Sequence, residues 1–164
     1  HHFIDFFGID MLDNCKSAKE RWGGVSEIID RWLQARQDML VQYCNLSNDD
    51  EDENNAQQGA KLRHFCQTMV DYISAGHFEI YDQLVKEGRE FEDADALKQA
   101  GTLFNIIDDT TEVILDLNDK YQETDDLSSL EPDLSRLGEA LETRFEAEDR
   151  MIAVLHVAHK DLVA

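Results

Sequence analysis

Apolar side chains recur every three or four residues through most of this sequence, and Pro132 is its single proline. This spacing places them on one face of an α-helix, which has about 3.6 residues per turn. Only 8 of the 164 residues are glycine, and no stretch alternates polar and apolar residues convincingly as a strand does. The sequence therefore predicts an all-α protein, and its length suits one domain with a substantial core.

We expect four helices, at about residues 13–46, 61–87 and 93–121, and from near Pro132 towards the C-terminus. Gly23 and Gly24 are expected to bend the first helix. Gly76 is expected to break or kink the second, because glycine costs a helix interior about 1 kcal/mol. The connections are short except for the acidic residues 47–59, which have no large apolar side chain and predict a solvated loop. This pattern predicts an antiparallel up-and-down four-helix bundle.

The formal net charge of −21 limits the kinds of partner that this chain can bind. Nucleic acids and anionic membrane surfaces attract basic proteins, so neither is expected as a direct ligand. A basic protein would instead be attracted, with an affinity that depends strongly on salt. Composition alone also allows a simpler explanation, in which the acidic residues only keep the protein soluble.

The three cysteines indicate the redox compartment of the protein, and the first ten residues indicate where the domain begins. Cys15, Cys44 and Cys66 are odd in number and widely separated, which predicts free thiols in a reducing compartment such as the cytoplasm. No apolar run approaches the ~20 residues that a membrane-spanning helix needs. Two histidines precede Met11, so we interpret residues 1–10 as an expression-tag remnant and residues 11–164 as the domain.

Each predicted helix carries a polar residue within its apolar stripe: Arg36, His77, Asp108 and Glu148. The stripe of the second helix is expected to contain Cys66, Val70, Ile73, His77, Ile80 and Leu84. The stripe of the third is expected to contain Leu97, Gly101, Phe104, Asp108, Thr111 and Leu115. The first helix is expected to bury Trp22, Val25, Ile29, Trp32 or Leu33, Arg36, Leu40 and Tyr43, and the fourth Gly138, Leu141, Phe145, Glu148, Ile152, Leu155, His159 and Leu162. An unpaired buried charge is very unfavourable, whereas a mutually bonded group is tolerated. The four polar residues therefore predict a buried ion-pair network at mid-height of the bundle.

A metal or catalytic site built from His77, Asp108 and Glu148 is the alternative use of these side chains. Di-iron bundles place a Glu-x-x-His pair on each of two helices, and this chain has no such pair. His156 and His159 are three residues apart, but they lack carboxylates in register and are expected to be an exposed terminal pair. Glycine-rich phosphate loops and nucleophile motifs are also missing from the sequence. We therefore expect neither an enzyme nor a cofactor.

The second helix also turns unusual residues away from its apolar stripe. Asp71, Ser74 and Phe78 lie on its polar side, with Glu79 and Asp82 close by. An apolar side chain surrounded by acids suits a basic partner that has apolar spots on its surface. Two simpler explanations stay open. Phe78 is a scattered surface residue in one, and a bend at Gly76 turns it into the core in the other.

Three blocks of the sequence look familiar: residues 29–36 (IDRWLQAR), 65–81 (FCQTMVDYISAGHFEIY) and 141–150 (LETRFEAEDR). Together they resemble the Rsd/AlgQ family of bacterial anti-sigma regulators, over about residues 11–163. The likeness is closer to the AlgQ side, through residues 20–24 (ERWGG) and 155–160 (LHVAHK). The loop after Leu46 is richer in acidic residues than the family leads us to expect.

The resemblance implies a function and a set of contact residues. Members of this family bind region 4 of the primary sigma factor, a helix-turn-helix module that contacts promoter DNA and the polymerase flap. They sequester the factor and free polymerase for alternative sigma factors, with effects on stationary-phase, alginate or virulence genes. Carried onto this chain, the contacts with sigma region 4 would be Asp30, Asp71, Ser74, Phe78 and Asp82.

Two other functions compete with this interpretation. One is an acidic binding module for another basic protein, such as an enzyme or a phosphocarrier, since family members are linked to such partners. The other is a metal-binding bundle that uses the polar core. Salt-sensitive binding that promoter DNA does not inhibit would favour the acidic binding module. Stoichiometric metal in the tag-free protein would favour the metal-binding bundle.

Overall fold

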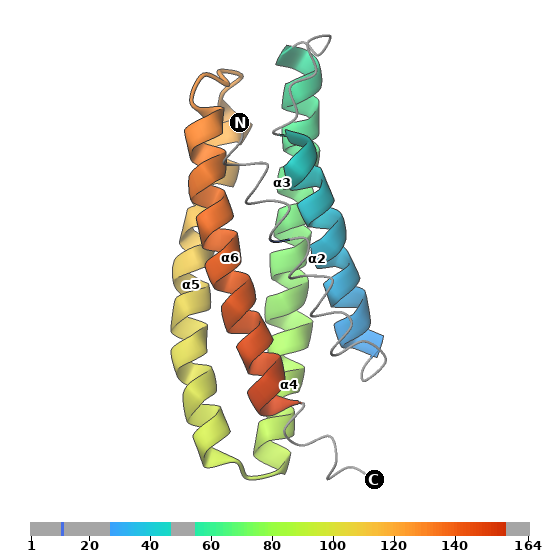
Figure 1. Ribbon diagram of the computed structural model, residues 1–164, viewed down its shortest axis with the longest axis vertical. Helices are drawn as coiled ribbons and strands as arrows, with labels where there is room; N and C mark the ends of the chain where they lie inside the picture. The colour runs from blue at the N-terminus through green and yellow to red at the C-terminus, as the bar shows by residue number, and fades with distance from the viewer. Residues whose placement is uncertain (1–10, 12–26, 47–54, 157–164) are drawn as a thin grey trace.

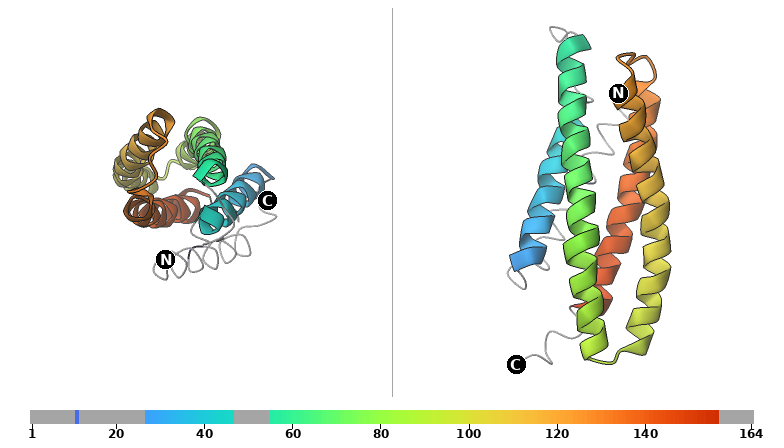
Figure 2. Two further views of the ribbon diagram at one scale, coloured as in Figure 1. Left: turned by 90° about the horizontal axis from the view of Figure 1, so that it is seen from above. Right: turned by 180° about the vertical axis from the view of Figure 1, so that it is seen from behind.

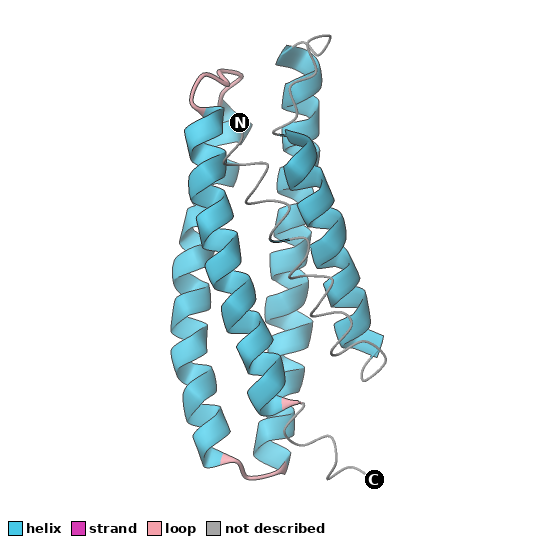
Figure 3. Ribbon diagram, viewed as in Figure 1, coloured by secondary structure: helices cyan, strands magenta, loops and turns pink. Residues whose placement is uncertain are grey.

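The computed structural model describes residues 11, 27–46 and 55–156 of the chain. It contains these helical elements: α2 (Glu27–Leu46), α3 (Asn55–Ala75), the π-helical turn η1 (Gly76–Ile80), α4 (Tyr81–Glu90), α5 (Ala94–Glu123) and α6 (Leu130–Leu155). Because α3, η1 and α4 follow one another directly, the described residues form four helical columns (Figure 1). Helix accounts for nearly all of the described chain, and it contains no strand (Figure 3). The all-α prediction is confirmed.

The columns run alternately up and down (Figure 1). Seen from above, they stand around a common centre, with α2 beside α3, α4 beside α5 and α5 beside α6 (Figure 2). Columns that are consecutive in the sequence are thus neighbours in space, and short connections join α4 to α5 and α5 to α6. This arrangement agrees with the predicted antiparallel bundle.

The first and last columns bury the stripes that their sequences predict. In α2, Ile29, Arg36, Leu40 and Tyr43 are all at most 3% exposed. The predicted residues of α6 that the structure describes are also buried: Gly138, Leu141, Phe145, Glu148, Ile152 and Leu155. Pro132 occupies the first turn of α6, where the missing amide hydrogen removes no helical hydrogen bond.

The second column contains the irregularity that Gly76 predicted, in the form of a π turn. The Tyr81 amide donates to the Gly76 carbonyl oxygen, a bond between residues five apart where an α-helix joins residues four apart. Before this turn the column buries Phe65, Met69 and Tyr72 at intervals of four and three residues. The same rhythm continued through Gly76 would bury Glu79. The extra residue in the turn buries the apolar Ile80 instead.

This insertion explains why part of the predicted stripe was wrong. Ile80 and Leu84 are buried as predicted. The prediction extended this stripe towards the N-terminus with regular α-helical spacing, which selected Val70, Ile73 and His77. In the structure His77 is exposed, and Val70 and Ile73 are only partly buried. His77 is therefore not a core residue.

The third helix also buries a different face from the predicted one. Gly101, Asp108 and Leu115 are exposed. The buried stripe lies one residue earlier: Ala96, Ala100, Ile107, Thr110, Ile114, Leu117 and Tyr121. Both stripes of α5 contain large apolar residues, so periodicity alone did not distinguish them. Packing against α6, the main neighbour of α5, selects the observed stripe.

Some helix boundaries differ from the predicted ones. The second helix begins at Asn55, so residues 55–59 of the expected loop are helical. The third begins at Ala94, where the Asp93 side chain accepts a 3.0 Å hydrogen bond from the Ala96 amide as an N-cap. Residues 47–54 of the acidic loop, the predicted bend at Gly23 and Gly24, and residues 1–10 all lie outside the described residues. Within the described part, no helix is long and apolar enough to cross a membrane.

Candidate functional site

The π turn η1 carries the most exposed large apolar side chain of the described residues. Phe78 is 75% exposed, so the prediction that it faces away from the core is confirmed. Its ring centroid lies 4.9 Å from that of His77, with an interplanar angle of 80°. Because the turn adds one residue, both rings stand on the outer side of the column while Gly76 and Ile80 face inwards.

The other predicted contact residues lie on the same column or on the helix beside it. Asp71 and Asp82 are exposed, whereas Ser74 is partly buried. Asp30, also partly buried, comes from α2, which packs against both α3 and η1. Asp71 accepts a 2.9 Å hydrogen bond from the Gln67 side-chain amide one turn earlier. Exposed or partly exposed acids thus occur on α2, α3 and α4, the three helices that contact the turn carrying Phe78.

A buried ionic network lies inside the bundle. Arg36 of α2 and Glu148 of α6 are each 1% exposed, and Arg36 Nη2 lies 3.4 Å from Glu148 Oε1. Arg36 Nη1 also lies 2.7 Å from Oδ1 of Asp149, which is near the surface. The guanidinium packs over the Phe145 ring, 4.7 Å from its centroid. The predicted pairing of Arg36 with Glu148 is confirmed, and Asp149 is an additional partner.

Two tyrosines complete the shell around Glu148. The Tyr72 hydroxyl donates to Glu148 Oε1 at 2.7 Å and accepts from Arg36 Nε at 3.0 Å. The Tyr81 hydroxyl donates to Glu148 Oε2. Burial, reinforced by the adjacent Glu148, raises the pKa of both phenols well above the ordinary value. Both tyrosines therefore stay neutral and act as donors to the carboxylate.

Arg144 is a second buried guanidinium beside the same carboxylate. Its Nε lies 3.4 Å from Glu148 Oε2, and its Nη2 donates to the Tyr81 hydroxyl at 3.2 Å. Its Nη1 donates to the Thr110 and Thr111 hydroxyls of α5, at 3.2 and 2.7 Å. Desolvation lowers the pKa of Arg144, but Glu148 together with Tyr81 and Tyr72 outweighs it, so the pKa is raised on balance. Arg144 therefore joins α5 to the network as a permanent cation.

Two members of the predicted network do not belong to it. His77 stands on the surface beside Phe78, and Asp108 is exposed on α5 because the buried stripe lies one residue earlier. Their places are taken by Tyr72, Tyr81 and Arg144, which sequence analysis missed. A usable signal existed for Arg144, since it precedes Glu148 by four residues and so lies on the same helix face. Nothing comparable marked the tyrosines, which resemble ordinary core aromatics.

The remaining sequence candidates are not assembled into a metal or reactive site. No group of three or more histidine, cysteine or carboxylate residues suited to a metal occurs within the described ranges. His156 is partly buried with Nδ1 2.7 Å from Glu87 Oε2, contrary to the predicted exposed pair, and His159 lies outside the described residues. Cys44 and Cys66 are free, as predicted, and desolvation raises the pKa of the Cys66 thiol to about 11.

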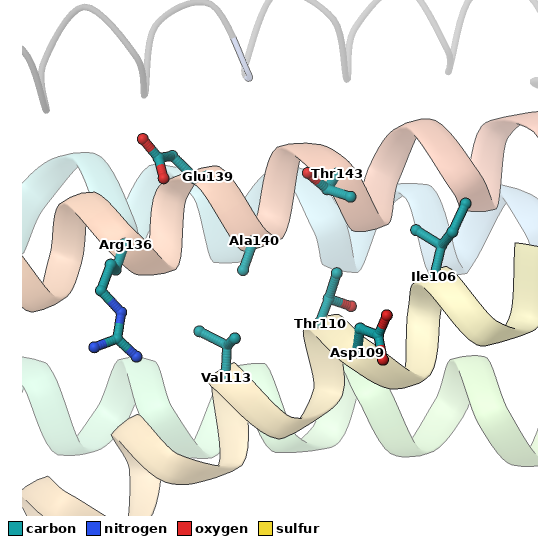
Figure 4. Close-up of a pocket in the computed structure, with 8 residues that line it drawn as sticks. All are labelled: Ile106, Asp109, Thr110, Val113, Arg136, Glu139, Ala140 and Thr143. Carbon is teal, nitrogen blue, oxygen red and sulfur yellow. The ribbon is translucent and has the colours of Figure 1, made fainter.

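A shallow groove of about 510 Å³ lies between α5 and α6. In Figure 4, Val113 and Ala140 point towards each other across it. Its polar lining mixes a cation, Arg136, with the acids Asp109 and Glu139. Charges of both signs give no preference for a basic or an acidic ligand, so the acidic surface around Phe78 is the stronger candidate.

Comparison with known proteins places this architecture in a family. The family model described as "Regulator of RNA polymerase sigma(70) subunit, Rsd/AlgQ" matches residues 11–156. A "Regulator of sigma D" from Yersinia pseudotuberculosis is 40% identical over 150 residues, covering 87% of both chains. Proteins of the same name from Yersinia enterocolitica and Salmonella paratyphi B are each 35% identical, and the latter match covers 92% of this chain and 95% of the relative.

These relatives carry the regulator of sigma D name, so the closer likeness to AlgQ stays a prediction. The family match spans every described element, including the π turn and all contributors to the buried network. The chain therefore belongs to the Rsd/AlgQ family of regulators of the RNA polymerase sigma(70) subunit.

Proposed function

We propose that this protein binds region 4 of the primary sigma factor of bacterial RNA polymerase and sequesters it in the cytoplasm. Its action is binding rather than catalysis, and it leaves polymerase available to alternative sigma factors. The observation that carries the proposal is Phe78, a large apolar ring with 75% exposure that the exposed acids Glu79 and Asp82 follow in the chain. Family membership supports the choice of partner.

Electrostatics favour this partner over nucleic acid. A helix-turn-helix module that reads DNA presents a basic surface. The net charge of −21 would attract that surface and would repel the DNA that it normally contacts. The protein thus competes with promoter DNA for region 4 without binding DNA itself.

The acidic residues and the aromatic ring have separate roles in this proposal. Phe78 is the apolar anchor, and it fills a pocket on the partner as interface hot spots do. Asp71 and Asp82, both exposed, set the association rate and the orientation of the basic partner. Asp30 and Ser74 are only partly exposed and complete the polar rim.

Titration of the protein with isolated region 4 at two salt concentrations tests the proposal. We expect saturable binding that weakens as salt increases, together with competition by promoter DNA for region 4. Absence of binding at both salt concentrations would refute the proposal. Salt-sensitive binding that promoter DNA leaves unchanged would point to another basic surface or another basic protein.

Reversing one charge on this surface should change the kinetics of binding. Asp71→Lys is expected to slow association severalfold at low salt and to have little effect at high salt, because screening removes the added repulsion. Stopped-flow measurement of the association rate checks this. Glu112→Lys provides a control of equal charge change at an exposed position on α5. Equal slowing in both variants would assign the effect to net charge and remove Asp71 from the interface.

A further inference from the structure

The exposed part of η1 presents two rings in contact. His77 and Phe78 are both exposed, and their centroids are 4.9 Å apart with the ring planes at 80°. Edge-to-face contact is a preferred geometry for aromatic pairs, and it stabilises one orientation of each ring. An isolated phenyl ring with 75% exposure would otherwise rotate among several rotamers. The contact therefore restricts the ring that the proposed function assigns as the anchor.

The backbone beneath this pair is held from the core. A Cβ atom at Gly76 would lie 3.1 Å from the Tyr81 hydroxyl and 3.4 Å from Trp32 Cζ2, so only glycine fits without displacement. The Tyr81 hydroxyl is itself fixed, since it donates to Glu148 and accepts from Arg144. Both ends of η1 thus abut the buried network. Rotation of the turn to a regular α-helix would move Tyr81 away from Glu148.

We propose that His77 is a positioning residue. It holds the Phe78 ring in the orientation in which the ring enters region 4. This inference rests on the proposed function, and it also predicts the feature of region 4 that receives the ring. We expect region 4 to offer a narrow apolar pocket with basic side chains at its rim, because the ring arrives in one orientation and the exposed acids Glu79 and Asp82 follow it in the chain. His77 acts through Phe78 and needs no contact of its own with region 4.

A double-mutant cycle with region 4 tests this role. We expect His77→Ala to weaken binding about three- to tenfold, the range of an aromatic pair, with an unchanged unfolding midpoint. In the Phe78→Ala background, His77→Ala should cause no further loss, because the ring that it positions is missing. His77→Phe should restore most of the affinity, since it keeps a ring edge beside Phe78. His64→Ala, at an exposed histidine of α3, is the matched control and should bind normally.

The ring orientation is also measurable without a partner. In the unbound protein, the NMR shifts of the Phe78 ring should move towards those of a freely rotating phenylalanine in His77→Ala and stay near wild type in His77→Phe. Unchanged ring shifts, or equal losses of affinity by His77→Ala in both backgrounds, would overturn the positioning role. If wild-type protein does not bind region 4, the proposed function fails, while the ring shifts still decide whether His77 orients Phe78.

Discussion

Replacement of Glu148 by alanine is expected to lower the free energy of unfolding by about 3–5 kcal/mol, the cost of removing one partner from a buried ion pair. The variant leaves Arg36 and Arg144 buried, each 1% exposed, without the carboxylate that lies 3.4 Å from both. It also removes the acceptor of the Tyr72 and Tyr81 hydroxyls. An unsatisfied buried donor costs about 1–3 kcal/mol, so these losses reinforce the loss of charge.

Urea unfolding monitored by circular dichroism measures this effect. Glu148→Gln should lose less stability than Glu148→Ala, because the amide oxygen still accepts from one hydroxyl and no cavity forms. Glu146→Ala provides the control on the same helix, since Glu146 is exposed, and it should stay within about 0.5 kcal/mol of wild type. A change of similarly small size in Glu148→Ala would contradict a stabilising role for the network.

Replacement of Phe78 by alanine is expected to weaken binding of region 4 by about 2 kcal/mol, or roughly thirtyfold, as truncation of an interface hot spot does. The free energy of unfolding should barely change, because a ring that is 75% exposed contributes little to the core. A large loss of affinity at constant stability would show that the ring serves the partner rather than the fold.

Calorimetric titration and urea unfolding of the same preparations separate the two quantities. Leu115→Ala is the matched control, because Leu115 is 42% exposed on α5 and is also a large apolar surface residue. Its affinity for region 4 should match that of wild type. Equal weakening in both variants would mean that binding depends on general surface hydrophobicity, and it would remove Phe78 from its proposed role as anchor.

The two columns with unambiguous patterns were predicted well from sequence. In α2 and α6 one stripe carries most of the large apolar residues, and Leu40 and Leu141, which belong to it, are both fully buried. Arg36 and Glu148 lie within those stripes, and their opposite charges required them to meet once both were buried. Pairing of these two residues followed from local periodicity plus the cost of an isolated buried charge.

Other features depended on contacts between distant parts of the chain. Tyr81 and Glu148 are 67 residues apart, and Arg144 lies 34 residues from Thr110, so no local pattern announces these bonds. Asp108 was misplaced because α5 has two adjacent stripes with apolar residues, and only packing against α6 and the bonds of Arg144 select one.

The sequence by itself determined the helical class, the four-column bundle and the acidic character. It favoured an outward Phe78 but left open a bend at Gly76 that would turn the ring into the core. These properties depend on local spacing and composition, which are visible along the chain. Only the tertiary structure decided the π turn at Gly76–Ile80, which adds one residue and moves His77 from the predicted core to the surface. The turn is favoured because it lets Tyr81 donate to Glu148 and buries Ile80 in place of Glu79. The hydrogen bond and the burial stabilise the protein only after the columns have packed together.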